Sequence, residues 1–165
     1  LYFGDETQAI YTYLGVLVYT AATEQDPSHS DWTIYNGEQV IVGSDSATGG
    51  DIVRRSSVTD TVTEINGNSW CYHTSARNTV NRGFCVSSYH FDSGVPYVGE
   101  IAAPLLSGAR TYRICHDFAS VDTAYDNERH PTVSPDGKYV VFESDWGTAA
   151  AVDVYVADFS HMNLP

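Results

Sequence analysis

Positive charge is the first thing that this sequence lacks. Lys138 is the only lysine, and eight Lys and Arg residues stand against 21 Asp and Glu residues, so the formal net charge is −13. A surface this acidic repels phosphate backbones and anionic lipid headgroups. We therefore expect no nucleic-acid partner and no attraction to a membrane surface, whereas cations and basic partners suit the charge.

Long apolar runs are lacking as well. No run reaches the roughly 18 residues that a membrane-spanning helix needs, and the best candidate, residues 10–22, is interrupted by Tyr, Thr and Gly. We predict a strand there and no membrane insertion by this segment. An acidic, lysine-poor chain rich in Ser, Thr and Tyr resembles secreted or periplasmic bacterial proteins, and we expect that localisation.

Common catalytic motifs are missing too. The sequence has no Gly-x-Ser-x-Gly elbow, no phosphate-binding glycine loop and no His-Glu-x-x-His. Its three cysteines, Cys71, Cys85 and Cys115, lack zinc-finger spacing. Two alternatives stay open for them: a disulfide between Cys71 and Cys85, or buried apolar thiols in strands. The absence of a complete catalytic set favours a protein that is not an enzyme.

Turns and short strands are what the sequence does contain. In "RHPTVSPDGKYVVFESDWG" (129–147), the turn formers Pro-Asp-Gly precede a β-branched and aromatic run, which Ser-Asp-Trp-Gly then ends. A second run, residues 152–156, follows directly. This pattern predicts an antiparallel meander, in which Asp145 and Trp146 form a turn and pack the last strands.

The same pattern occurs earlier in the chain. "DWTIYNGEQVIVGSD" (31–45) aligns without a gap with "PTVSPDGKYVVFESD" (131–145), which matches the turn glycines, a central valine and the terminal Ser-Asp. "YHTSARNTVNRGFCVSSYHF" (72–91) supplies an intervening unit. Periods of about 40 to 50 residues with four short strands each are typical of a β-propeller.

These motifs, above all "HPTVSPDGKYVVFESDWG…VDVYVADF", resemble the WD-like repeat of bacterial propellers of the TolB and oligogalacturonate lyase type. The resemblance covers most of the chain from about Ser28 onward. It implies an all-β fold over residues 1–165, a partial β-propeller of three to four four-stranded antiparallel blades. The expected units are 1–27 (a partial blade), 28–68, 69–110 and 111–165.

Ring closure needs more blades than these units supply. Known propellers have about four to eight blades, because each blade buries both faces against its neighbours. We therefore expect missing sequence or a partner chain to complete the ring. A non-propeller closure of the sheets is the less favoured alternative.

Three histidines occupy similar places in the three units. His29, His73 and His130 precede the turn glycines of their units by 8, 10 and 7 residues. In a propeller this spacing places each one where an innermost strand begins, near the mouth of the central channel. The alternative is structural: each imidazole caps an inner strand and bonds backbone carbonyls of the next blade.

The resemblance to oligogalacturonate lyase implies a divalent metal ion held by His29, His73 and His130. The match is incomplete, because this chain has a single His130-Pro131 where the lyase has a doubled His-Pro preceded by Gln. Arg77 and Arg82 follow His73 and could reach the same channel, where a guanidinium would bind an acidic sugar. The alternative for them is an ion pair between blades.

Two functions follow from this reading. The first is a secreted or periplasmic binding and assembly module, non-catalytic as it stands, with a channel-mouth site of His29, His73, Arg77 and His130 for a protein or an acidic glycan. The second is part of a metal-dependent polysaccharide (uronate) lyase. Imidazoles that meet at one point favour the lyase, whereas imidazoles bonded to backbone carbonyls exclude it.

Overall fold

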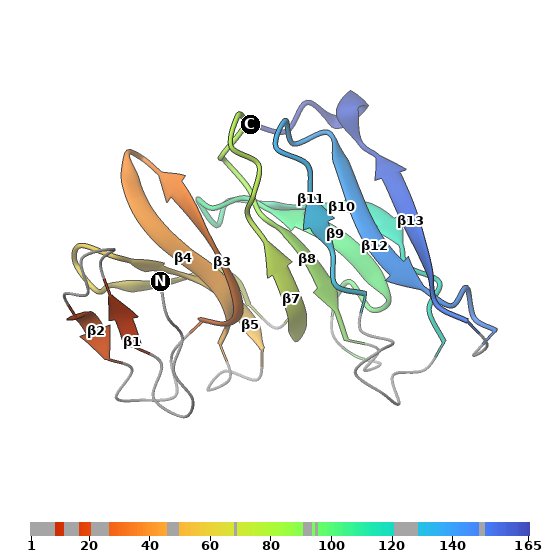
Figure 1. Ribbon diagram of the computed structural model, residues 1–165, viewed down its shortest axis with the longest axis horizontal. Helices are drawn as coiled ribbons and strands as arrows, with labels where there is room; N and C mark the ends of the chain where they lie inside the picture. The colour runs from red at the N-terminus through yellow and green to blue at the C-terminus, as the bar shows by residue number, and fades with distance from the viewer. Residues whose placement is uncertain are drawn as a thin grey trace.

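The computed structural model describes residues 9–11, 17–20, 27–45, 50–67, 69–90, 94, 96–120, 129–148 and 151–165, with side chains from residue 29 onward. It is an all-β structure whose sheets stand side by side (Figure 1). The described residues contain no helix of the length and apolarity that a membrane span requires. The strands are β1 (Ala9–Tyr11), β2 (Leu17–Thr20), β3 (Pro27–Tyr35), β4 (Glu38–Asp45), β5 (Asp51–Ser56), β6 (Val62–Asn66), β7 (Cys71–Ser75), β8 (Val86–Tyr89), β9 (Glu100–Pro104), β10 (Thr111–His116), β11 (Thr132–Val133), β12 (Tyr139–Ser144) and β13 (Asp153–Asp158), followed by the short 3-10 helix η3 (Ser160–Met162).

Each large sheet is an antiparallel meander with its strands in chain order. The sheets are β3-β4-β5-β6, β7-β8-β9-β10 and β11-β12-β13, and β1 pairs with β2. Asn36 and Gly37 join β3 to β4 with φ of 52° and 81°. Positive φ at both central residues is the geometry of a type I′ hairpin turn, which favours Asn-Gly. The predicted antiparallel meander of short strands is therefore present.

The sheets divide the chain slightly differently from the predicted units. The first sheet spans residues 27–66 and the second spans 71–116. The predicted unit boundary at 110/111 falls inside the second sheet, because β10 pairs with β9 from Thr111 to His116. Three strands of the last unit are described, β11 to β13.

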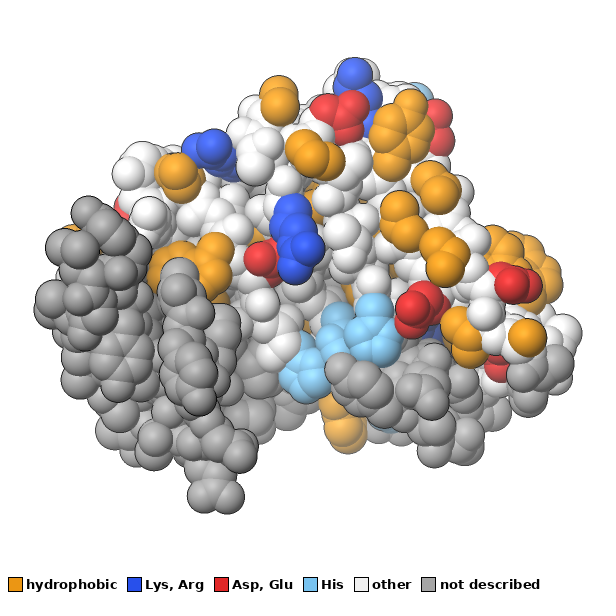
Figure 2. Space-filling model, in the orientation of Figure 1, with side chains coloured by type: hydrophobic (Ala, Val, Ile, Leu, Met, Phe, Trp, Pro, Cys, Tyr) orange, Lys and Arg blue, Asp and Glu red, His pale blue; other side chains and the backbone are white. Residues whose placement is uncertain are grey.

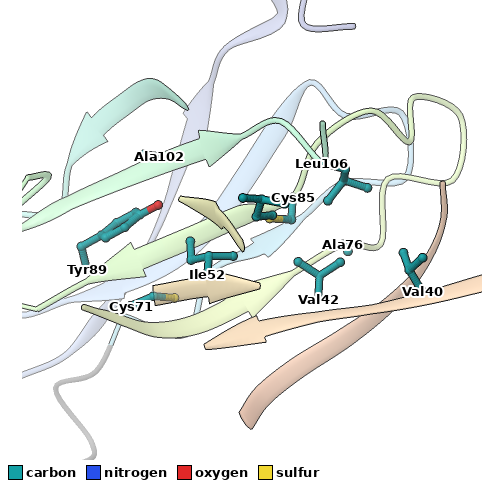
Figure 3. Close-up of a cluster of buried hydrophobic side chains, with 10 residues drawn as sticks. Val40, Val42, Ile52, Cys71, Ala76, Cys85, Tyr89, Ala102 and Leu106 are labelled. Carbon is teal, nitrogen blue, oxygen red and sulfur yellow. The ribbon is translucent and has the colours of Figure 1, made fainter. Parts of the chain in front are cut away.

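Two apolar clusters hold the sheets together. Between the first and second sheets, Val42 and Ile52 pack with Cys71, Cys85 and further buried side chains (Figure 3). Full burial of such side chains stabilises the fold by about 1.5–3 kcal/mol each. A similar cluster joins the second and third sheets, and its members include Phe84, Val86, Ile101, Val140 and Phe142.

All three cysteines are free thiols, so the disulfide is not formed, and the buried-thiol alternative holds for Cys71 and Cys85, whereas Cys115 is partly exposed. Cys71 and Cys85 are 3% and 0% exposed. Burial raises the pKa of Cys71 to about 11, although hydrogen bonds from Thr74 and Ser87 partly oppose this. Burial also raises the pKa of Cys85 well above its usual range. A thiol that stays protonated is a poor nucleophile and metal ligand, which leaves packing as the role of these two side chains.

A buried ion pair links the second sheet to the third. Arg129 Nε lies 2.8 Å from Asp117 Oδ2, and both side chains are 0% exposed. Asp117 follows β10, and Arg129 precedes β11. The pair therefore ties the end of the second sheet to the start of the third.

The last sheet has one covered face and one open face. In β12, Val140 and Phe142 are buried, whereas Val141 between them is 41% exposed. Val141 lies opposite Val156 of β13, which is 64% exposed. Val154 is 67% exposed in the same strand. These residues form the open face of the last sheet, which is where the next blade of a ring would pack.

Candidate ligand-binding site at the channel mouth

The first strands of the three sheets are close neighbours. β7 contacts β3 on one side and β11 on the other. In a propeller the first strand of each blade is the innermost one, so these three strands line the central channel. Residues where β3, β7 and β11 begin consequently gather at one end of that channel.

Three histidines lie close together at this end. His29 Nδ1 lies 3.0 Å from His73 Nδ1, and the rings of His73 and His130 have centroids 4.2 Å apart. Figure 2 shows histidine side chains gathered in one patch on this face, with a Lys or Arg side chain close by. We refer to His29, His73 and His130 as the histidine cluster.

β-Bulges aim two of these side chains. In β3 the register shifts between Ser28 and Asp31, where three steps along the strand match two steps along β4. In β7 an identical one-residue bulge lies between Cys71 and Thr74. His29 falls inside the first bulge and His73 inside the second. A bulge re-aims side chains by breaking the alternation of the strand, and here both bulges turn an imidazole toward the same point.

The backbone of the histidine cluster is also strained. His29 and His130 have φ of 46° and 22°, values that residues other than glycine rarely adopt. Pro131 restricts His130 further, because the residue before proline is driven toward extended conformations. Such strain costs on the order of 1–3 kcal/mol per residue and concentrates at functional sites.

Two carboxylates that sequence reasoning did not assign to the site complete it. Glu143 Oε2 lies 3.0 Å from His130 Nδ1. Asp31 Oδ2 accepts hydrogen bonds from Arg77 Nε and from the Ala76 backbone N–H, both at 3.1 Å. Asp31 lies on β3 and Arg77 follows β7, so this is the ion pair between blades that was the alternative for Arg77.

The cluster borders a small cavity of about 140 Å³. Asp31, His73, Arg77 and His130 are among its lining residues. His73 and His130 are half-buried and His29 is exposed. The cavity thus presents imidazole and guanidinium groups, on a protein that is otherwise strongly acidic.

These donors suit a transition metal in type but not in arrangement. Imidazole nitrogens are common ligands for zinc, copper, iron and nickel. Within the described residues, however, no three His, Cys, Asp or Glu side chains are placed so that all could hold one ion. His73 contacts both of the other members of the histidine cluster, His29 and His130.

Trp146 packs as predicted, but it is also exposed. Its ring stacks on Tyr155 at 5.1 Å and contacts Phe118 at 4.6 Å between centroids. Trp146 is 51% exposed and Phe118 is 54% exposed. Asp145 ties the two loops together by accepting hydrogen bonds from the backbone N–H groups of Ser120 and Gly147. The result is an exposed, fixed aromatic platform at the end of β10 and β12.

Solved structures similar to this chain are propellers. Oligogalacturonate lyase from Vibrio parahaemolyticus matches with a TM-score of 0.56 and 19% identity, over 86% of this chain and 38% of the lyase. An oligogalacturonate lyase in complex with manganese matches with a TM-score of 0.57 and 17% identity, over 87% of this chain and 38% of its own. A putative TolB from Agrobacterium tumefaciens matches with a TM-score of 0.53 and 16% identity, over 93% of this chain and 57% of its own.

No family model and no curated protein matches the sequence. The chain spans 38% of the length of both lyases. At these identities the likeness concerns the fold. The chain is therefore part of a β-propeller of the type that oligogalacturonate lyase and TolB adopt.

Proposed function

We propose that this chain is a secreted or periplasmic binding and assembly module whose channel mouth binds an acidic glycan. The observation that carries the proposal is the meeting of His29, His73 and His130 beside Arg77. Guanidinium and imidazole groups are good donors to sugar carboxylates. Two β-bulges and two strained backbone positions hold the histidines in this arrangement. Histidines that only bond backbone carbonyls would not require such features.

Exposed aromatic rings at the same end of the sheets support a glycan rather than a protein as the ligand. β11 and β12 are antiparallel, so the end of β12, with Trp146, lies beside the start of β11, with His130. The hydrogen bond from Glu143 N–H to Arg129 O joins these two places directly. Amphipathic rings such as indole offer an apolar face for sugar rings and a polar edge.

A direct test is calorimetric binding of linear oligogalacturonides to the intact protein. We expect binding that His73→Ala weakens by about tenfold or more, as for the loss of one charge-assisted hydrogen bond. His161→Ala is the matched control, because His161 is exposed in η3, far along the chain from the cluster. Equal affinities of the two variants would overturn the proposal, as would equal affinity for neutral cello-oligosaccharides.

The assembly role rests on the open face of the last sheet. We infer that further sequence or a partner chain covers Val141, Val154 and Val156 and completes the ring, because large exposed apolar patches are uncommon on isolated soluble proteins. Native mass spectrometry of the purified assembly tests this. A longer parent chain or a second propeller chain is expected, and a stable lone 18.1 kDa monomer would contradict the inference.

A second candidate, part of a metal-dependent uronate lyase, is favoured by one distance. Two cis ligands about 2.1 Å from an octahedral ion are about 3.0 Å apart, which is the separation of His29 Nδ1 and His73 Nδ1. A divalent ion there would help to acidify the carbon next to the uronate carboxylate. His130 would have to turn toward it, away from Glu143.

Calorimetry with Mn²⁺ alone distinguishes the two candidates. The lyase reading requires Mn²⁺ binding that is lost in His73→Ala and retained in His161→Ala, together with release of unsaturated uronate from oligogalacturonides. Glycan binding without Mn²⁺ binding would leave the binding module as the function and exclude the lyase.

A further inference from the structure

A larger cavity lies beside the first one and shares Arg77 with it. Its volume is about 390 Å³, and its lining includes Trp32, Ile34, Arg77 and Arg82. Ligand pockets typically measure about 300–1,000 Å³. His29 and Ile34 are five positions apart in β3, which corresponds to at most about 16 Å at roughly 3.3 Å per residue. Arg77 lines both cavities, but the remaining lining residues of this one are its own.

The charged side chains that line this cavity are two guanidiniums, those of Arg77 and Arg82. Arg77 uses its Nε for Asp31, and Arg82 uses its Nε for the backbone carbonyl of Thr79. These bonds leave the terminal guanidinium nitrogens of both residues for a ligand. The lining includes no carboxylate. Two of the chain's eight cationic residues therefore share one cavity in a protein of net charge −13.

The cavity also has an apolar side. The indole ring of Trp32 and the side chain of Ile34, which is 37% exposed, supply the apolar part of the wall.

We propose that this cavity is a second binding site, for a small organic carboxylate with an apolar body. The carboxylate would accept hydrogen bonds from the planar forks of Arg77 and Arg82, because guanidinium binds carboxylates in a bidentate manner. The apolar body would lie against Trp32 and Ile34. The lining residues come mainly from β3 and from the segment that follows β7, and Arg77 is shared with the cavity at the histidine cluster.

The test is calorimetry on the intact protein with 2-naphthoate as the probe. Arg82→Gln is expected to weaken binding at least tenfold, as expected for a lost charge-assisted pair. Arg110→Gln is the matched control, because Arg110 is also exposed but lies at the β9–β10 turn. His73→Ala should leave naphthoate binding unchanged, which separates this site from the proposed glycan site.

Two further probes decide the ligand class. The neutral isostere 2-naphthalenemethanol should bind at least tenfold more weakly than 2-naphthoate, and so should inorganic phosphate. Equal binding of the alcohol would overturn the role of the guanidiniums, and equal binding of phosphate would overturn the apolar body. Absence of naphthoate binding, or equal losses in Arg82→Gln and Arg110→Gln at unchanged melting temperature, would overturn the site itself.

Discussion

Removal of one partner from the buried Arg129–Asp117 pair should destabilise the protein severely. Both side chains are 0% exposed, and the charged atoms are 2.8 Å apart. Asp117→Asn keeps the shape of the side chain but removes the carboxylate charge that lies beside the buried Arg129 guanidinium. Breaking a buried pair from one side typically costs about 3–5 kcal/mol, because the remaining ion has lost its water as well as its partner. The loss should be insensitive to salt, since buried charges are poorly screened.

Urea unfolding of the intact protein, followed by circular dichroism, measures this loss. The double variant Asp117→Asn with Arg129→Met removes both charges and should recover most of the lost stability. Lys138→Met is the control, because Lys138 and Asp136 are 4.0 Å apart with both side chains largely exposed, and it should change little. A loss below about 1 kcal/mol in Asp117→Asn, or a double variant no more stable than the single one, would refute the reasoning.

Three further outcomes are expected. Because burial raises the pKa of Cys71 from 9.0 to about 11, its contribution to stability is retained below pH 9 and should fall between pH 9 and 11 by on the order of 1 kcal/mol per pH unit. Burial raises the pKa of Cys85 and Cys115 as well, so Cys71→Ala should reduce the slope of this part of a pH series of urea melts without abolishing it. Gly50→Ala should destabilise more than Gly37→Ala, because a Cβ at Gly50 (φ 100°) would lie 2.9 Å from Trp70 whereas one at Gly37 (φ 81°) meets nothing; equal losses in thermal melts would contradict this. Val156→Asp should lower the melting temperature of the complete assembly if another blade covers the open face, and an unchanged value would mean that the face stays in solvent.

Much of the fold is encoded locally and could therefore be predicted. The Asn-Gly and Asp-Gly turns and the β-branched runs after them determine each hairpin within a few residues. The spacing from turn glycine to histidine then placed His29, His73 and His130 at the starts of the inner strands, where the structure has His29 and His73 in β3 and β7 and His130 just before β11.

The remainder depends on contacts between distant residues. The one-residue bulges arise from the pairing of β3 with β4 and of β7 with β8, and no local motif in the sequence marks them. Glu143 and Asp31 each look like one of many surface carboxylates until their strands lie beside His130 and Arg77. The exposure of Trp146 likewise depends on which neighbouring loops cover it.

The paired bulges make this site unusually sensitive to changes in chain length. Each bulge is one extra residue between fixed ladder positions, Ser28 to Asp31 in β3 and Cys71 to Thr74 in β7. Deletion of a single residue in either interval would restore the regular alternation and move an imidazole to the opposite side of its strand. A substitution in these intervals can weaken the site by degrees. A one-residue deletion would instead remove a histidine from the site completely. Among related chains, the length of these two intervals is therefore a sharper marker of a shared channel-mouth site than the identity of any single residue.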